Sequence, residues 1–281
     1  MDSPEERVKI VIAESERLKQ YLNALPPEAW RTPSACDRWE VRDVVAHLAA
    51  QGQFYADMIS RSLQGDTSTP EGRPAAGSAT AASVSEGAAQ RVLSQRERLG
   101  DQVLAEFTTI NDQLNHRLAS LGPQDWEKPH FFNSLGIAPL RFRPALRLFE
   151  LALHEWDIRS RLEPDVHLSD EHLPVLMGLV CGPFTRWIFR PGPRLPVPIR
   201  YRFALTGAGA RDTDIVVEGD TASIEPAGPA AATVTCRCDT EPFVLIMAGR
   251  RPLPEALAQG RIVAEGEVEQ VDAFAQWFGG M

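Results

Sequence analysis

Residues 149–163, FELALHEWDIRSRLE, are the stretch of this chain that decides its fold. Glu150 and His154 are four residues apart, and on a helix two residues at this spacing lie one above the other on the same face. A second stretch, WEVRDVVAHLAAQ at 39–51, places His47 in an amphipathic helical pattern. Because helical bundles build metal sites from carboxylates and histidines on facing helices, these residues predict one site shared by two helices.

Three ligands of this kind leave a coordination position open for water or substrate, which is typical of catalytic zinc. Each part also has a simpler explanation. A Glu–His pair four residues apart is a common helix contact, and a histidine in an apolar run such as VVAHLAA is more often a hydrogen-bonded core residue. The presence of His47 on one amphipathic helix and of Glu150 and His154 on another favours a metal site. Several divalent ions suit this ligand set, so we predict a divalent metal, with zinc as the first choice.

Composition limits the classes of function. The chain has 281 residues, which at about 150 residues per domain suggests two domains. Its 29 basic and 38 acidic residues give a net charge of −9, which disfavours nucleic acid and anionic membranes as partners. The sequence has neither an apolar leader nor a stretch of transmembrane length, and its four cysteines do not form the pattern of a secreted disulfide framework. We therefore expect a cytoplasmic protein with reduced thiols.

Residues 1–165 read as a helical domain. Apolar periodicity, Ser3 as a cap and Pro4 as a first helical residue predict the opening helix. A stretch rich in small residues, Gly and Pro at 65–83 is typical of a surface loop, and Gly100 marks where the third helix can break. The predicted helices span 4–25, 41–63, 84–121 and 145–161.

Residues 166–281 read as a mixed domain. A helix is expected at 169–184, short strands follow between Gly, Asp and Pro turns, and the last fifty residues return to helix, strand and helix. The predicted strands are VPIRYRFAL at 197–205, DTDIVVEG at 212–219, ASIEP at 222–226 and ATVTCRC at 232–238. The predicted fold class is therefore α+β in two domains, a four-helix bundle followed by a mixed α/β domain.

Two signatures in the helical half resemble one known family. LPPEAWRTPSACDRWEVRDVVAHLAAQ at 25–51 and FELALHEWDIRSRL at 149–162 are similar to the motifs of the mycothiol-dependent maleylpyruvate isomerase family, whose N-terminal domain is a DinB-like four-helix bundle. The segment EPFVLIMAGRRPLPEALAQGRIVAEGEVEQVDAFAQWF at 241–278 is similar to the sterol-carrier-like domain fused to many members. The chain departs from the family at 36–39, where Cys-Asp-Arg-Trp replaces the usual Cys-Pro-Gly-Trp. This departure implies a different substrate or thiol pocket.

The resemblance implies a chemistry. In the family a metal, usually zinc, is held by residues that match His47, Glu150 and His154, and the thiol cosubstrate is mycothiol, a cysteine-containing sugar of actinobacteria. A thiol at the metal becomes a nucleophilic thiolate, which adds to a small electrophilic substrate. The outcome is cis–trans isomerisation or S-transfer.

The family is also understood to use a C-terminal arginine in catalysis. Arg250, Arg251 and Arg261 are the candidates, and the resemblance does not choose among them. A solvated surface role is the simpler explanation for each.

Two other functions stay open. The same scaffold can activate water instead of a thiol, which would make the protein a metal-dependent hydrolase. Alternatively, the sterol-carrier-like domain can hold an apolar ligand in a non-enzymatic small-molecule or lipid-binding protein. Retention of all three predicted metal ligands argues against the binding protein, and a thiol requirement would separate the first two. The sequence predicts neither the substrate nor the oligomeric state.

Overall fold

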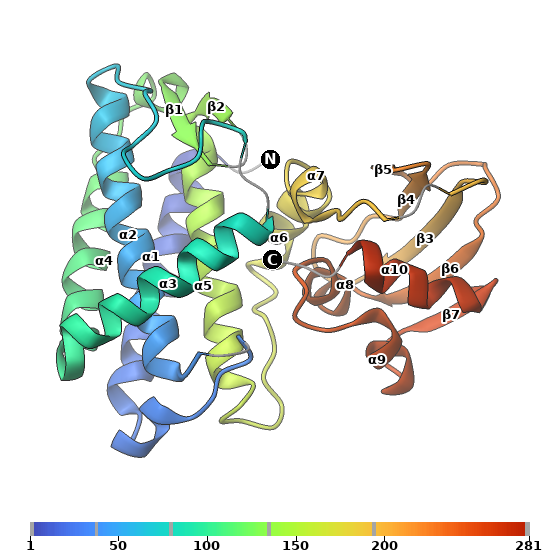
Figure 1. Ribbon diagram of the computed structural model, residues 1–281, viewed down its shortest axis with the longest axis horizontal. Coiled ribbons are helices and arrows are strands. Elements are labelled where there is room, and N and C mark those ends of the chain that lie inside the picture. The colour runs from blue at the N-terminus through green and yellow to red at the C-terminus, as the bar shows by residue number, and fades with distance from the viewer. Residues whose placement is uncertain (1–2, 37–38, 79–80, 134–135, 193–194, 279–281) are drawn as a thin grey trace. The chain divides into compact units, whose positions relative to one another are not determined.

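The computed structural model describes residues 3–278 except 37–38, 79–80, 134–135 and 193–194. Its contacts divide the chain into two compact units, residues 1–167 and residues 168–281 (Figure 1). The first unit consists of helices and one small hairpin, and the second contains a mixed sheet with helices. The predicted α+β class, a helical half followed by a mixed half, is confirmed. Among the described residues, none of the helices combines the length and apolarity that a membrane span requires.

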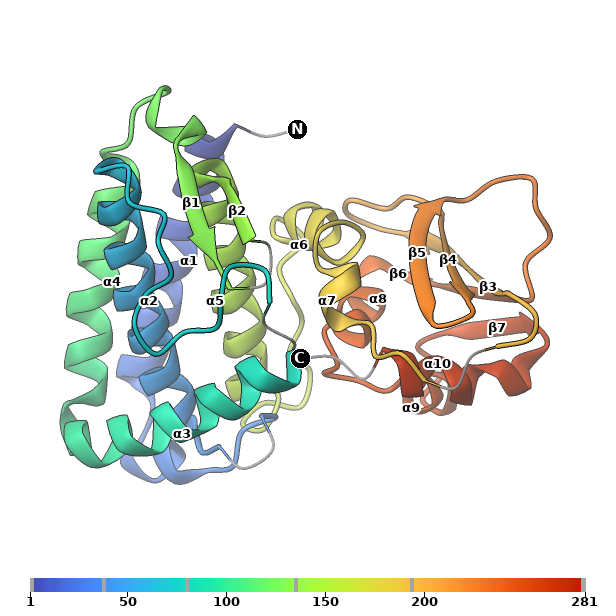
Figure 2. The same ribbon diagram turned by 45° about the horizontal axis from the view of Figure 1, so that its top comes forward.

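Four helices of the first unit pack as a bundle, and a fifth, α3 (Ala81–Leu99), runs across α2 (Figures 1 and 2). The first bundle helix begins with the predicted cap, since Ser3 and Glu6 form reciprocal hydrogen bonds of 2.9 and 3.2 Å. The bundle helices are α1 (Pro4–Ala24), α2 (Val41–Leu63), α4 (Val103–Ala119) and α5 (Arg143–Arg159).

The helix predicted at 84–121 is broken at Gly100, where the sequence allowed a break. The segment forms α3 and α4, separated by a 3₁₀ turn at Gly100–Gln102, and only α4 belongs to the bundle. Gly100 has a φ of +52°, a left-handed conformation that glycine adopts without steric cost. The sequence also missed a hairpin in the connection that enters α5. Its strands are β1 (Pro129–Phe132) and β2 (Gly136–Pro139).

Arg147 ties three bundle helices together. Its side chain is fully buried, and it donates hydrogen bonds to the Leu48 carbonyl oxygen of α2 at 3.2 Å and to Asn111 Oδ1 of α4 at 2.9 Å. Gly52 allows α2 and α4 to approach closely here, because a Cβ at this position would lie 3.0 Å from Ile110 Cγ2. These contacts set the register of α5 against α2.

The second unit is built on a five-stranded sheet of order β5-β4-β3-β6-β7, in which β3 and β6 are parallel and the other neighbours antiparallel. The strands are β3 (Ile199–Thr206), β4 (Thr213–Glu218), β5 (Thr221–Pro226), β6 (Val234–Asp239) and β7 (Val263–Gly266). The helices are α6 (Leu173–Val180), α7 (Thr185–Ile188), α8 (Thr240–Met247), α9 (Leu253–Ala258) and α10 (Val271–Trp277).

Aromatic side chains of the central strand hold helices against the sheet. Tyr201 and Phe203 of β3 are fully buried. The Phe203 ring centroid lies 4.8 Å from that of Phe243 in α8 and 5.6 Å from that of Phe274 in α10. Burial alternates along β3, as expected of a strand with one face in the core. The helix predicted at 169–184 is shorter, because turns from Cys181 to Phe184 separate α6 from α7.

A buried histidine anchors the hairpin to the start of α5. The guanidinium of Arg143 contacts Nε2 of His130, and it lies 4.0 Å above the Tyr55 ring and 4.5 Å above the Phe132 ring. His130 is fully buried. Burial, and secondarily the charge of Arg143, lower the pKa of His130 to about 2. His130 is therefore neutral in the folded protein.

We expect this histidine to make stability depend on pH. Below an unfolded-state pKa of about 6.5, unfolded His130 binds a proton that the folded state does not, so stability falls as pH falls. The loss attributable to His130 is roughly 1 kcal/mol per pH unit between pH 6 and pH 5. Urea unfolding of wild type and His130→Gln at several pH values measures how the free energy of unfolding depends on pH. The exposed His116→Gln serves as the control. Parallel curves for wild type and His130→Gln would contradict the prediction.

Candidate metal centre

The packing of α2 against α5 brings the three predicted ligands together. Glu150 and His154 are one turn apart on α5, and His47 projects from α2. Glu150 Oε2 lies 3.3 Å from His47 Nε2 and 3.4 Å from His154 Nε2. One ligand atom from each residue lies within 4.8 Å of the others. The donor set is two imidazoles and one carboxylate, which suits zinc and related divalent ions.

The three candidate ligands are mostly buried, but each side chain keeps some solvent exposure. The side chains of His47 and His154 are 11% and 10% exposed, and that of Glu150 is 22% exposed, so Glu150 faces the accessible side. Burial opposes ionisation of Glu150, but hydrogen bonds from His154 and His47 outweigh it and lower the pKa of the carboxyl. Burial lowers the pKa of His47, and its hydrogen bond to Glu150 only partly offsets this. Glu150 is therefore ionised and His47 neutral, which is the state that metal binding requires of these two residues.

Asp157, which the sequence motifs did not single out, orients His154. Its Oδ2 lies 2.8 Å from His154 Nδ1 and accepts that N–H, which turns Nε2 toward Glu150 Oε2 at 3.4 Å. Burial lowers the pKa of His154, but hydrogen bonds to Asp157 and Cys36 outweigh it and raise the pKa. A carboxylate behind a ligating histidine is a common feature of metal sites. The spacing from His154 to Asp157, three residues on one helix, was the signal available in the sequence.

Cys36 completes a second group around the same aspartate. Its Sγ donates to Asp157 Oδ2 at 2.9 Å and lies 3.7 Å from His154 Nδ1. Cys36, His154 and Asp157 thus form another cluster of ligand types. His154 Nδ1 already bonds the carboxylate, so we assign this cluster to the support of His154. Residues 37–38, where the chain departs from the Cys-Pro-Gly-Trp pattern, lie outside the described residues.

Trp39 covers the two histidines. Its ring centroid lies 5.0 Å from that of His47 and 6.4 Å from that of His154. The start of α2 is fixed nearby by Asp43, which accepts from the Glu40 N–H at 3.0 Å and forms an ion pair with Arg96 of α3 at 3.1 Å. An apolar ring beside the ligands limits the access of water on this side.

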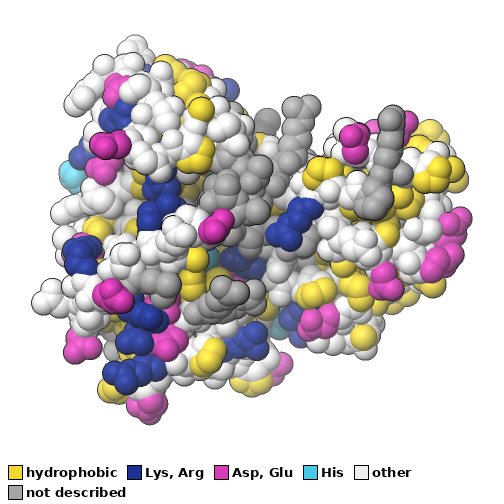
Figure 3. All heavy atoms as spheres, viewed as in Figure 1, with side chains coloured by type: hydrophobic (Ala, Val, Ile, Leu, Met, Phe, Trp, Pro, Cys, Tyr) yellow, Lys and Arg dark blue, Asp and Glu magenta, His cyan; other side chains and the backbone are white. Residues whose placement is uncertain are grey.

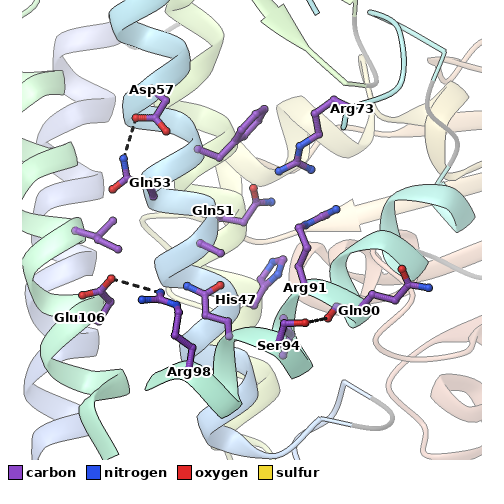
Figure 4. A pocket seen from close by; sticks show the side chains of 15 residues that line it. His47, Gln51, Gln53, Asp57, Arg73, Gln90, Arg91, Ser94, Arg98 and Glu106 are labelled. Atoms are coloured by element: carbon purple, nitrogen blue, oxygen red, sulfur yellow. Dashed lines mark hydrogen bonds and ion pairs between the residues drawn. The ribbon is translucent and has the colours of Figure 1, made fainter. Parts of the chain in front are cut away.

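A pocket of about 640 Å³ opens beside His47 (Figure 4). Its walls come from α2, α3, α4 and the loop that follows α2. Gln51 connects the pocket with the three candidate ligands, because it lines the wall and donates to Glu150 Oε1 at 3.2 Å. The volume is in the range of small-molecule sites.

The three arginine candidates all lie in the second unit. Arg250 follows α8 and donates to the Ala248 carbonyl oxygen at 3.0 Å. Arg251 is half-buried and Arg261 is exposed after α9. Burial lowers the pKa of Arg251, and the nearby charge of Arg261 lowers it further.

A family model matches residues 11–159, which is more than half of the chain, and it describes the mycothiol maleylpyruvate isomerase N-terminal domain. The chain belongs to the mycothiol maleylpyruvate isomerase family. The crystal structure of the mycothiol-dependent maleylpyruvate isomerase aligns with a TM-score of 0.65 at 14% identity, over 94% of this chain and 96% of that one. A histidine-to-alanine mutant aligns with a TM-score of 0.64 at 13% identity and the same coverage. No curated protein matches the sequence significantly.

The three residues that converge in the structure also lie within the part of the chain that matches the family model. His47, Glu150 and His154 all fall inside the matched range 11–159. At 14% identity the alignment to the isomerase structure establishes the fold, which spans both units of this family member.

We expect Asp157→Asn to weaken zinc binding about 10- to 100-fold, because the amide cannot hold His154 as the carboxylate does. Competition with a chromophoric chelator measures the zinc affinity. Circular dichroism should show that the variant stays folded. Asp101→Asn, an exposed change of the same kind, should leave the affinity unchanged. Equal affinities of wild type and Asp157→Asn would show that the aspartate does not support the metal.

Proposed function

We propose that this protein is a metal-dependent enzyme of the maleylpyruvate isomerase type that uses mycothiol as its thiol cosubstrate. The observation that carries the proposal is the convergence of His47, Glu150 and His154, within 4.8 Å, in a chain of this family. The pocket beside His47 supports it, because an open metal position needs an adjoining space for substrate. Zinc is the proposed metal, since two histidines and a carboxylate are a common catalytic zinc set.

Different residues of the chain would bind the metal and position its ligands. His47 Nε2, Glu150 Oε2 and His154 Nε2 would hold the metal. Asp157 retains the proton on His154 Nδ1, and Gln51 holds the second oxygen of Glu150. Bound zinc would lower the pKa of a thiol at its open position and so supply a thiolate near neutral pH. In isomerisation the thiol forms and then releases a carbon–sulfur bond at the double bond, so it is regenerated unchanged.

Metal content tests the first half of the proposal. We expect about one equivalent of zinc per chain in wild type after zinc loading and desalting, measured by plasma mass spectrometry. His47→Ala and His154→Ala should lose it, because each removes one of three ligands. His116→Ala, an exposed histidine of α4, is the matched control and should keep the metal. A wild type that binds no zinc would overturn the proposal.

Thiol dependence tests the second half. With the zinc-loaded protein, we expect isomerisation of maleylpyruvate, followed by NMR, only when mycothiol is added. Accumulation of a thiol conjugate instead would assign S-transfer. Turnover of an ester or amide without thiol would assign the hydrolase.

The catalytic arginine and the sterol-carrier-like character of the second unit stay predictions. Changing Arg250, Arg251 and Arg261 singly to Gln should identify one position at which kcat falls at least tenfold with zinc content unchanged. Equal kcat in all three variants would remove a C-terminal arginine from the proposal.

A further inference from the structure

Arg73 and Arg91 are two of the three arginines that line the pocket beside the candidate metal centre, and the third is Arg98. Arg73 comes from the loop after α2, and Arg91 comes from α3. Arg73 stacks on Phe54 of α2, with its Cζ 4.4 Å from the ring centroid. Figure 4 shows both guanidinium groups on the side of the pocket that faces Gln51 and His47, with Arg91 extending toward Arg73.

Neither guanidinium is neutralised within the part of the chain that the structure describes. Arg73 and Arg91 form no ion pair there. Burial lowers the pKa of both groups, and the charge of Arg91 lowers the pKa of Arg73 further. Arg73 is half-buried and Arg91 is exposed, and their two like charges on one pocket wall repel each other. This arrangement becomes favourable when an anion binds between them.

The acidic groups of the same pocket are engaged elsewhere. Glu106 pairs with Arg98 at 3.7 Å, and Asp57 Oδ1 accepts a hydrogen bond from Gln53 at 2.8 Å. These contacts lie on the α2 and α4 side of the pocket, away from Arg73 and Arg91 (Figure 4). The space-filling view shows several Lys and Arg side chains exposed over α2 and α3, although the whole chain is acidic (Figure 3). Within the described ranges of the chain, neither of the two pocket carboxylates pairs with Arg73 or Arg91.

We propose that Arg73 and Arg91 form a carboxylate-binding subsite that positions an anionic organic substrate, such as a dicarboxylate, against the metal centre. Guanidinium groups bind carboxylates through charge-assisted, often bidentate, hydrogen bonds. Gln51 links this subsite to the metal centre, because it shares the pocket wall with both arginines and hydrogen-bonds Glu150. The inference rests on the proposed function for the chemistry that follows binding. The binding step itself depends on the two arginines.

Calorimetric titration with maleate in the absence of thiol tests the subsite. We expect Arg73→Gln and Arg91→Gln each to weaken maleate binding at least tenfold, in both zinc-loaded and metal-free protein, because each removes a charge-assisted hydrogen bond. Arg31→Gln, which removes an exposed positive charge from the same unit, should leave the affinity within twofold of wild type. The uncharged dimethyl ester of maleate should bind wild type and both variants equally weakly.

The outcomes separate this inference from the proposed function. Arginine-dependent maleate binding by a protein that takes up no zinc would support the subsite and overturn the metal-dependent enzyme. Zinc binding and thiol-dependent turnover with maleate affinity unchanged in Arg73→Gln and Arg91→Gln would overturn the subsite alone. In the turnover assay the subsite predicts a KM at least tenfold higher in each variant with zinc content unchanged. Circular dichroism and thermal unfolding confirm that the variants are folded.

Discussion

The register of α5 against α2 is the constraint on which the candidate site depends. Arg147 lies on α5 one turn before Glu150, and its buried guanidinium donates to the carbonyl oxygen of Leu48, the residue after His47 on α2. This hydrogen bond sets the register of the two helices. A shift of one residue along α5 would rotate Glu150 about 100° away from His47. A buried guanidinium that lost its two acceptors, on Leu48 and Asn111, would destabilise the fold, so these contacts favour one helix pairing over its neighbours.

Arginines of the first unit lie in two kinds of environment. Arg147 donates through Nη1 and Nη2 to oxygen acceptors inside the bundle, and the Arg143 guanidinium lies above the Tyr55 and Phe132 rings. These two arginines stabilise packing. Arg73 and Arg91 face an open pocket, where their charge is available to a ligand. The difference lies in the surroundings of each guanidinium and not in the residue type.

Local patterns predicted much of the fold and part of the site. The start of α1, the span of α2 and three central strands of the second unit followed from caps, periodicity and turn residues. Glu150 and His154 were predictable as a pair because helical spacing is a local property. The hairpin β1–β2 was missed because its strands are four residues long and include prolines. The direction of α3 was missed because it depends on the conformation of Gly100 and on the ion pair between Arg96 and Asp43.

The sequence by itself determined the helical and mixed halves of the chain, the family, and the three candidate ligands, since these depend on short-range patterns and motifs. Only the tertiary structure decided that His47 meets Glu150 and that an arginine in a Gly- and Pro-rich loop faces one from α3. Those relations join residues far apart in the chain or choose between faces of a helix. They follow from how the helices pack, which no short window of sequence specifies.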